Sequence, residues 1–204
     1  ANYEPITTTV QAVVTARPIT VTAETKDDFV YDGTEKSVSY NITEGTLADG
    51  QEEAVTLSGD RRTEVGGNTV EVKEVKVFTV VEEGEEPTDV TENYSITPIN
   101  GHIQVNNNKT DLKFVEAETR GYNGVYDGKA HGGVTSVKVT GINGSEIAAE
   151  DMTVEYRVSD KDAWSKTMPK VTAVADTTPV QIQVTVANYE PITTTVQAVV
   201  TARP

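Results

Sequence analysis

The sequence predicts an all-β protein built from tandem β-sandwich domains. Valine and threonine dominate the composition, apolar and polar residues alternate in several short segments, and turn pairs that contain glycine separate these segments. Branched Cβ atoms favour strands because they pack well on a pleated surface. Several short strands with regular turns are typical of a sandwich, and 204 residues are enough for two small domains.

One segment occurs at both ends of the chain. Residues 1–18 read "ANYEPITTTVQAVVTARP", and residues 187–204 repeat all eighteen without a change, at a period of 186. Such identity indicates a tandem duplication and predicts a repeat protein. We expect residues 1–18 to be the C-terminal strand segment of a preceding repeat. Without the other strands of that repeat, the segment should stay extended and add to a sheet edge or pack against a neighbouring molecule.

A more divergent repeat lies inside this period. The segment "FVYDGTEKSVSYNI" (29–42) resembles "GVYDGKAHGGVTSV" (124–137), and an Asn-Tyr pair recurs later in each half. The spacing between the two landmarks is 63 residues in both halves, because 94 − 31 and 189 − 126 both equal 63. These landmarks are Tyr31 and Tyr94 in the first half and Tyr126 and Tyr189 in the second.

The constant spacing predicts two structural units. Unit one is expected at 19–107 and unit two at 108–204, after the orphan segment 1–18. The junction "VNNNKTD" (105–111) is polar and lacks apolar anchors, which indicates a linker.

Alternation predicts individual strands. In "QIQVTV" (181–186) and "SVSYNI" (37–42) every second residue is apolar, as expected for strands with one buried face. The segment "TVEVKEVKVFTV" (69–80) alternates but loses phase between Val72 and Val75, which predicts a β-bulge.

Pairs of Asp or Asn with Gly predict tight hairpins, since these residues tolerate the positive φ that such turns need. The pairs are Asp32-Gly33, Asp49-Gly50, Asn100-Gly101, Asp127-Gly128 and Asn143-Gly144. One short helix is expected at "GSEIAAEDM" (144–152), with Ser145 as its N-cap.

Two motifs in these units resemble a known family. Tyr-Asp-Gly followed by a strand, and then Asn-Tyr-x-Ile with Gly-x-Ile-x-Val, resemble the Ig-like tandem repeats of YDG or MBG type in bacterial surface proteins, notably Gram-positive adhesins. Unit one carries the motifs at Tyr31, Asp32, Gly33, Asn93, Tyr94, Ile96, Gly101, Ile103 and Val105. Unit two carries them at Tyr126, Asp127, Gly128, Asn188 and Tyr189, but departs from the pattern at Pro191, Val196 and Ala198.

The resemblance implies two Ig-like sandwiches that act as stalk or spacer repeats and project a distal binding domain from the cell wall. It implies display on the bacterial cell surface, anchorage through regions outside this sequence, and neighbouring repeats as partners. The alternative is a repeated weak binding module that recognises host protein or glycan by avidity.

Charge and composition exclude several other classes of function. The net charge of −15 repels phosphate backbones and anionic lipids, so nucleic acid and membranes are poor partners. No apolar run approaches the ~20 residues of a membrane helix, and no basic-then-apolar leader is present, so we expect a segment internal to a longer protein. The absence of cysteine excludes disulfides and thiolate metal sites.

The recurring motifs are interpreted as structural. Each Tyr-Asp-Gly is expected to form a turn with a packed tyrosine rather than a ligand site. Each Asn-Tyr is expected to bury its tyrosine near a sandwich corner, with the hydroxyl bonded to backbone. A Lys–Asn isopeptide crosslink is the alternative, with Lys26 and Lys113 as the lysines in candidate first strands.

Few residues suggest chemistry. The acidic clusters 81–89 and 158–164 offer oxygen ligands but lack the spacing of a calcium loop. His102 and His131 lack a catalytic constellation, so no catalytic, cofactor-binding or metal-binding residue is expected, and the protein is predicted not to be an enzyme. Trp164, the lone tryptophan, is expected in the core; if exposed, it would be the first candidate for a ligand contact.

Overall fold

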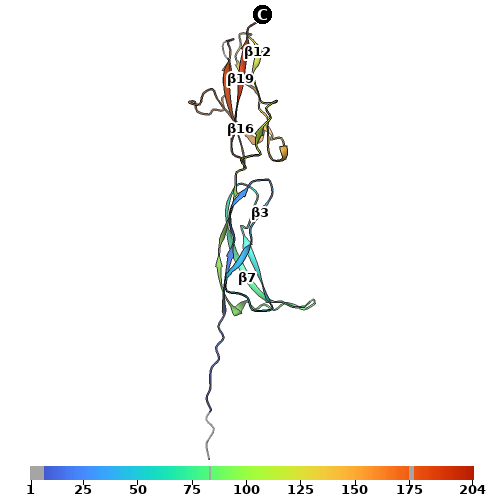
Figure 1. Ribbon diagram of the computed structural model, residues 1–204, viewed down its shortest axis with the longest axis vertical. Coiled ribbons are helices and arrows are strands. Elements are labelled where there is room, and N and C mark those ends of the chain that lie inside the picture. The colour runs from blue at the N-terminus through green and yellow to red at the C-terminus, as the bar shows by residue number, and fades with distance from the viewer. Residues whose placement is uncertain (1–6, 83, 175–176) are drawn as a thin grey trace, which may run out of the picture. The chain divides into compact units, whose positions relative to one another are not determined.

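In the computed structural model, which describes residues 7–82, 84–174 and 177–204, strands dominate and the predicted all-β fold class is confirmed (Figure 1). The helical elements in the described residues are short 3-10 turns, and none is long and apolar enough to cross a membrane. These turns are η1 (Thr91–Asn93), η2 (Ile142–Gly144) and η3 (Ala149–Asp151).

The described residues form two compact units. The first comprises residues 7–27, 37–62 and 67–103, and the second comprises residues 28–36, 63–66 and 104–204. The second unit thus includes two short segments from the first half of the sequence, and one of them contains the first Tyr-Asp-Gly motif.

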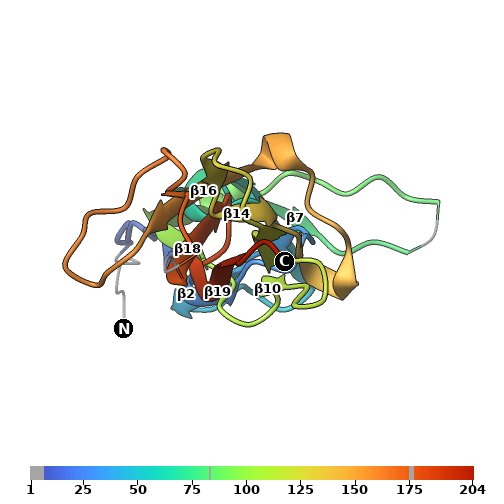
Figure 2. The same ribbon diagram turned by 90° about the horizontal axis from the view of Figure 1, so that it is seen from above.

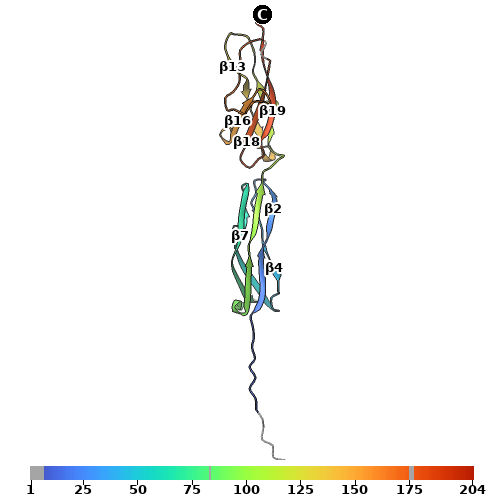
Figure 3. The ribbon, with the colours of Figure 1, turned by 90° about the vertical axis from the view of Figure 1, so that its left-hand side faces the viewer.

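Among the described residues of the first half, the strands form three sheets. Strands β2, β4 and β7 are labelled in Figure 3. In one of the three sheets, β1 lies between β4, to which it is antiparallel, and β8, to which it is parallel. The strand order of the largest sheet is β2-β9-β7-β5, and β3 pairs with β6. The bounds are β1 (Arg17–Ala23), β2 (Thr25–Val30), β3 (Lys36–Ser37), β4 (Tyr40–Glu44), β5 (Gln51–Ser58), β6 (Arg61–Arg62), β7 (Gly66–Thr79), β8 (Tyr94–Ile99) and β9 (Gly101–Asn106).

The predicted β-bulge in this half is confirmed. In the β5–β7 pair, Thr56 lies opposite Glu74 but Leu57 lies opposite Val72, which leaves Lys73 as the extra residue. The bulge restores the inward phase of β7, so that both Val70 and Val77 are fully buried.

Among the described residues of the second half, the strands form one four-stranded sheet and three short pairs. Strands β12, β16 and β19 are labelled in Figure 1. The sheet order is β12-β19-β18-β16; β19 is parallel to β12 and antiparallel to β18. The short pairs are β10–β15, β11–β14 and β13–β17. The bounds are β10 (Lys113–Phe114), β11 (Arg120–Gly121), β12 (Asn123–Val125), β13 (His131–Gly132), β14 (Val134–Ser136), β15 (Val139–Thr140), β16 (Met152–Arg157), β17 (Lys170–Val171), β18 (Thr178–Val186) and β19 (Ile192–Thr201).

Alternation along β18 and β19 builds the core of the second unit. Val180, Ile182 and Val184 are fully buried, and the residues between them are more exposed. On β19, Ala198 and Val200 are buried in the same cluster. The predicted alternation of 181–186 is therefore confirmed.

The prediction of tight hairpins at the Asp-Gly and Asn-Gly pairs is wrong except at Asn143-Gly144. There Thr140 pairs antiparallel with Glu146, and the N–H of Gly141 donates to the carbonyl of Ser145 at 2.8 Å. The strands on either side of each of the other pairs belong to different sheets: β2 lies beside β9, for example, whereas β3 pairs with β6. The required backbone conformation is nevertheless present, with φ of 79° at Gly33 and 80° at Gly128. Apart from the turn at Asn143-Gly144, these turns connect different sheets and do not close a strand ladder.

The predicted helix at 144–152 is also wrong. Ala148 is extended between η2 and η3, and Asn143 and Gly144 both have positive φ. Ser145 does not cap a helix; its hydroxyl donates to the carbonyl of Ile142 at 2.8 Å. A helix this short is unstable without a packed face to hold it.

The two copies of the duplicated segment have different structures. Residues 7–16 are exposed and lack regular secondary structure (Figure 3), whereas their equivalents in the second copy lie almost entirely in β19. Arg17 and Pro18 begin β1. Residues 1–6 of the predicted strand segment lie outside the described residues.

We predict that Ile182→Ala lowers the free energy of unfolding by about 2–5 kcal/mol, because it removes a fully buried side chain from the centre of β18. Thr185→Ala, at an exposed position of the same strand, should change it by less than about 0.5 kcal/mol. Chemical denaturation followed by Trp164 fluorescence measures both. Equal losses of unfolding free energy in the two variants would show that Ile182 does not lie in the core.

Candidate functional site: repeated turn motifs and a buried asparagine

Both Tyr-Asp-Gly motifs form the same side-chain turn. The Asp32 carboxylate accepts from the backbone N–H of Thr34 at 2.9 Å, and Asp127 accepts from that of Lys129 at 2.9 Å. An aspartate that bonds its own backbone two residues on shapes the turn before the glycine takes positive φ. The motifs are therefore built from the same local contacts.

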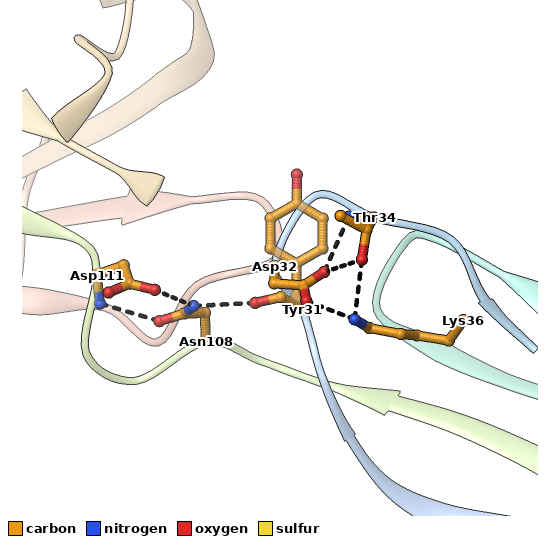
Figure 4. Close-up of polar contacts among 6 residues, drawn as sticks. All are labelled: Tyr31, Asp32, Thr34, Lys36, Asn108 and Asp111. Carbon is orange, nitrogen blue, oxygen red and sulfur yellow. Dashed lines mark hydrogen bonds and ion pairs between the residues drawn. The ribbon is translucent and has the colours of Figure 1, made fainter. Parts of the chain in front are cut away.

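A basic side chain four residues after each aspartate completes the motif. Lys36 donates to Asp32, and Nε2 of His131 lies 2.9 Å from Asp127 (Figure 4 shows the first pair). Hydrogen bonds from Lys36 and then Thr34 hold the pKa of Asp32 far below its usual range. The pKa of Asp127 is also lowered, first by its hydrogen bond with His131.

Lys36 was not singled out from the sequence, and His131 was considered only as a catalytic candidate and dismissed. Both follow their Tyr-Asp-Gly at the same distance, since 131 − 36 and 126 − 31 both equal 95. A comparison of the two halves at this offset would have found the pair. A search by residue identity misses it because lysine and histidine share only their ability to carry a positive charge.

Both Asn-Tyr motifs place a buried tyrosine against backbone from an earlier loop. The hydroxyl of Tyr94 accepts from the N–H of Ala48 at 2.8 Å and donates to Gln51 at 2.6 Å. The hydroxyl of Tyr189 accepts from the N–H of Ile142 at 3.2 Å. Each tyrosine is 8% exposed, and the two bonds reach back 46 and 47 residues. We call these two contacts the tyrosine latches.

The asparagines of these motifs differ. Asn188 has a positive φ of 69°; its side-chain oxygen accepts from the N–H of Val65 at 2.9 Å and its amide donates to Glu64. Asn93 is exposed in η1, and its backbone N–H donates to the carbonyl of Val90 at 3.0 Å.

The tyrosines of the Tyr-Asp-Gly motifs also differ. Tyr31 packs edge-on against Tyr189, with ring centroids 5.6 Å apart and an interplanar angle of 79°. Burial and the nearby charge of Glu64 raise the pKa of Tyr31. Tyr126 is 44% exposed, and its backbone N–H donates to the carbonyl of Thr201 at 2.9 Å.

Asn108 lies at the centre of a hydrogen-bond network in the second unit (Figure 4). Its side-chain amide donates to the carbonyl of Tyr31 at 2.9 Å and to the carboxylate of Asp111 at 2.7 Å. Its side-chain oxygen accepts from the N–H groups of Thr110 and Asp111, both at 2.9 Å. We call Asn108 and these three partners the Asn108 hub.

The backbone of Asn108 adds two further bonds. Its N–H donates to Asn188 and its carbonyl accepts from Glu190, both at 2.9 Å. At 4% exposure, the residue anchors the segment that the sequence indicates as a polar linker. The segment is thus polar but ordered by hydrogen bonds.

A groove of about 600 Å³ runs beside this network. Its walls come from the first Tyr-Asp-Gly turn, from the loop around η2 and from the turn before β19. They include Tyr31, Asp32, Thr34, Ile142, Asn143 and Tyr189.

Trp164 is half-buried in the loop between β16 and β17. It was expected in the core, but it does not belong to the core cluster of the second unit. This loop projects from the sheet, seen in orange at the left of Figure 2. The guanidinium of Arg157 lies 4.3 Å from the centre of the indole ring, and it also bonds Gln181 and Asp160. One face of the indole is therefore already covered by a cation.

The remaining candidate residues from the sequence do not form a common site. Lys26 and Lys113 are exposed, so neither lies in the dry core that an isopeptide crosslink needs. His102 pairs with Asp27 at 2.8 Å, far in sequence from His131. Among the residues that the structure describes, no group of three His, Asp or Glu side chains is placed to hold a metal ion.

No family model matches the chain, and no curated protein sequence is similar to it. What the motifs do must therefore be argued from their own contacts.

We predict that Tyr94→Phe lowers the free energy of unfolding by about 1–3 kcal/mol, because it leaves the N–H of Ala48 without its acceptor. Tyr189→Phe should cost about 1 kcal/mol, since one longer bond is lost. Tyr126→Phe, at the exposed tyrosine, should be neutral in urea denaturation. An equal loss for all three variants would contradict the latch assignment.

We predict that Asp32→Asn destabilises the protein at pH 7 and that the difference from the parent disappears on acidification. A depressed carboxylate pKa stabilises the fold above the ordinary value of 3.8, and this stabilisation is lost as the pH falls toward the lowered value. The gap in melting temperature between the two proteins should therefore narrow steadily as the pH falls below about 4.

The control for this series is Glu116→Gln, which removes an exposed carboxylate outside the motifs. Its difference from the parent should stay small across the same range. A constant gap between Asp32→Asn and the parent at every pH would show that the carboxylate charge is not what stabilises the turn.

Proposed function

We propose that the chain consists of two tandem Ig-like β-sandwich repeats of YDG or MBG type, which serve as stalk or spacer elements of a bacterial cell-surface adhesin. The observation that carries the proposal is the recurrence of one set of contacts at an offset of 95 residues. The offset relates Asp32 to Asp127, Lys36 to His131 and Tyr94 to Tyr189.

The polar groups that recur in the two halves are hydrogen-bonded to other groups of the same chain. Each motif aspartate bonds its own turn and a nearby basic side chain, and each latch tyrosine bonds backbone. Repeated groups that are satisfied internally stabilise a fold, whereas a repeated binding site would present recurring unsatisfied groups to solvent. This favours a structural role over catalysis.

The charge supports the same role. With 32 acidic and 17 basic residues in 204, neighbouring repeats of this composition would repel one another and resist collapse. Repeats that contact only their neighbours add length in proportion to their number. The proposal places the chain outside the cell, anchored to the cell wall through other regions, with neighbouring repeats as its partners.

A repeated weak binding module for host protein or glycan is the second candidate. One observation favours it: Val30 and Val125, which precede the two Tyr-Asp-Gly motifs, are 48% and 50% exposed. An exposed apolar position that recurs at the repeat offset is a candidate contact for avidity. Among the described residues, the other large exposed apolar side chains do not recur in this way.

The test is the length of recombinant arrays. We predict that arrays of one, two and four 186-residue periods show a maximum dimension, from small-angle scattering, that increases in proportion to the number of periods. The increase should be smaller in high salt, because ions screen the repulsion. Dimensions that level off with repeat number would contradict the spacer role and favour the binding module.

A further inference from the structure

The N-terminal segment, residues 7–16, exposes apolar side chains that a folded protein normally buries. Val10, Val13 and Val14 are 86%, 74% and 97% exposed. Three valines within five residues, all open to solvent, indicate a surface that binds something.

The second copy of this sequence shows an environment in which the same side chains are buried. At the offset of 186, Val10, Ala12 and Val14 correspond to Val196, Ala198 and Val200, which are 9%, 0% and 4% exposed in β19. The side chains and their order are the same, so the difference lies in the neighbours. β19 has β12 on one side and β18 on the other, and we call the position between them the β19 slot.

We propose that residues 7–16 of one copy of this chain enter the β19 slot of a second copy. The slot supplies ladders on both sides of the strand, parallel to β12 and antiparallel to β18, so it satisfies more backbone groups than addition to a sheet edge. The slot also fits the segment's apolar side chains, because it already holds the identical ones.

Exchange creates a second contact that the unexchanged chain lacks. Thr201 of β19 accepts from the backbone N–H of Tyr126, and Thr15 is the residue equivalent to Thr201. Exchange therefore places Tyr126 of the receiving copy next to Thr15 of the inserting copy. Thr15 lines a groove of about 390 Å³ together with Asn93 and Tyr94.

This new contact has a precedent within the second unit. Tyr126 is equivalent to Tyr31, and Tyr94 is equivalent to Tyr189, at the offset of 95. Tyr31 and Tyr189 pack edge-on at 5.6 Å, beside Asn188. The 44% exposed Tyr126 and the exposed Asn93 would gain the same kind of neighbours in the exchanged pair.

The chain's own β19 competes for the slot. A strand tethered by a short turn acts at an effective concentration on the order of 1 mM, so the parent protein favours its own strand at ordinary concentrations. The test therefore disables β19 in the full chain and asks whether the N-terminal segment replaces it.

The variant Val196→Asp/Ala198→Asp puts two carboxylates on the buried face of β19. Its second unit should fold only when another copy donates residues 7–16, so folding should increase with chain concentration. Trp164 fluorescence reports on the second unit, and light scattering should give masses of at least twice 22.0 kDa.

Two further variants decide the outcome. Adding Val10→Asp/Ala12→Asp should abolish both folding and assembly. Adding Thr9→Asp/Gln11→Asp should not, since their equivalents Thr195 and Gln197 are exposed on β19. The proposal is overturned if adding Val10→Asp/Ala12→Asp leaves the folding and the assembly of the β19-disabled variant unchanged. This holds whether that variant is folded or unfolded before the addition. It is also overturned if the β19-disabled chain folds as a monomer.

Discussion

The side-chain amide of Asn108 makes four hydrogen bonds, two donated and two accepted, and the second unit depends on this one buried group. Four bonds are the full capacity of an asparagine side chain. They tie the first Tyr-Asp-Gly turn to residues 108–111, while the backbone of Asn108 holds the turn before β19. The Tyr31–Tyr189 contact and the neighbouring groove are formed by the segments that these bonds hold together.

The same physical rule explains the duplicated segment. Eighteen identical residues include a buried central strand in one place and, in residues 7–16, an exposed segment without secondary structure in the other. Strand propensity is therefore not enough, because a strand needs partners for its backbone groups and a surface for its apolar face. The strands beside β19 supply both.

Residue patterns predicted those parts of the fold that depend on local chemistry. Alternation identified the buried residues of β18, and its loss of phase identified the bulge at Lys73. The glycine pairs predicted positive φ at Gly33 but not which strands would flank it, since strand pairing is decided by contacts distant in sequence.

The site was less accessible from the sequence. Asn108 lies in a run of three asparagines that differ only in their surroundings, and nothing in the run marks the buried one. Lys36 and His131 differ in type, so their shared role emerges only when the hydrogen bonds to Asp32 and Asp127 are seen. Trp164 was expected in the core, but a loop and Arg157 hold it at the surface.

The dependence of the second unit on Asn108 is tested by comparing the unfolding free energies of Asn108→Ala and Asn107→Ala in urea, with Trp164 fluorescence as the signal. Asn108→Ala should lose about 3 kcal/mol, because four part-buried hydrogen bonds are lost together. Asn107 is half-exposed and should tolerate alanine within about 0.5 kcal/mol. Equal stabilities of the two variants would contradict the claim that the second unit depends on the Asn108 hub.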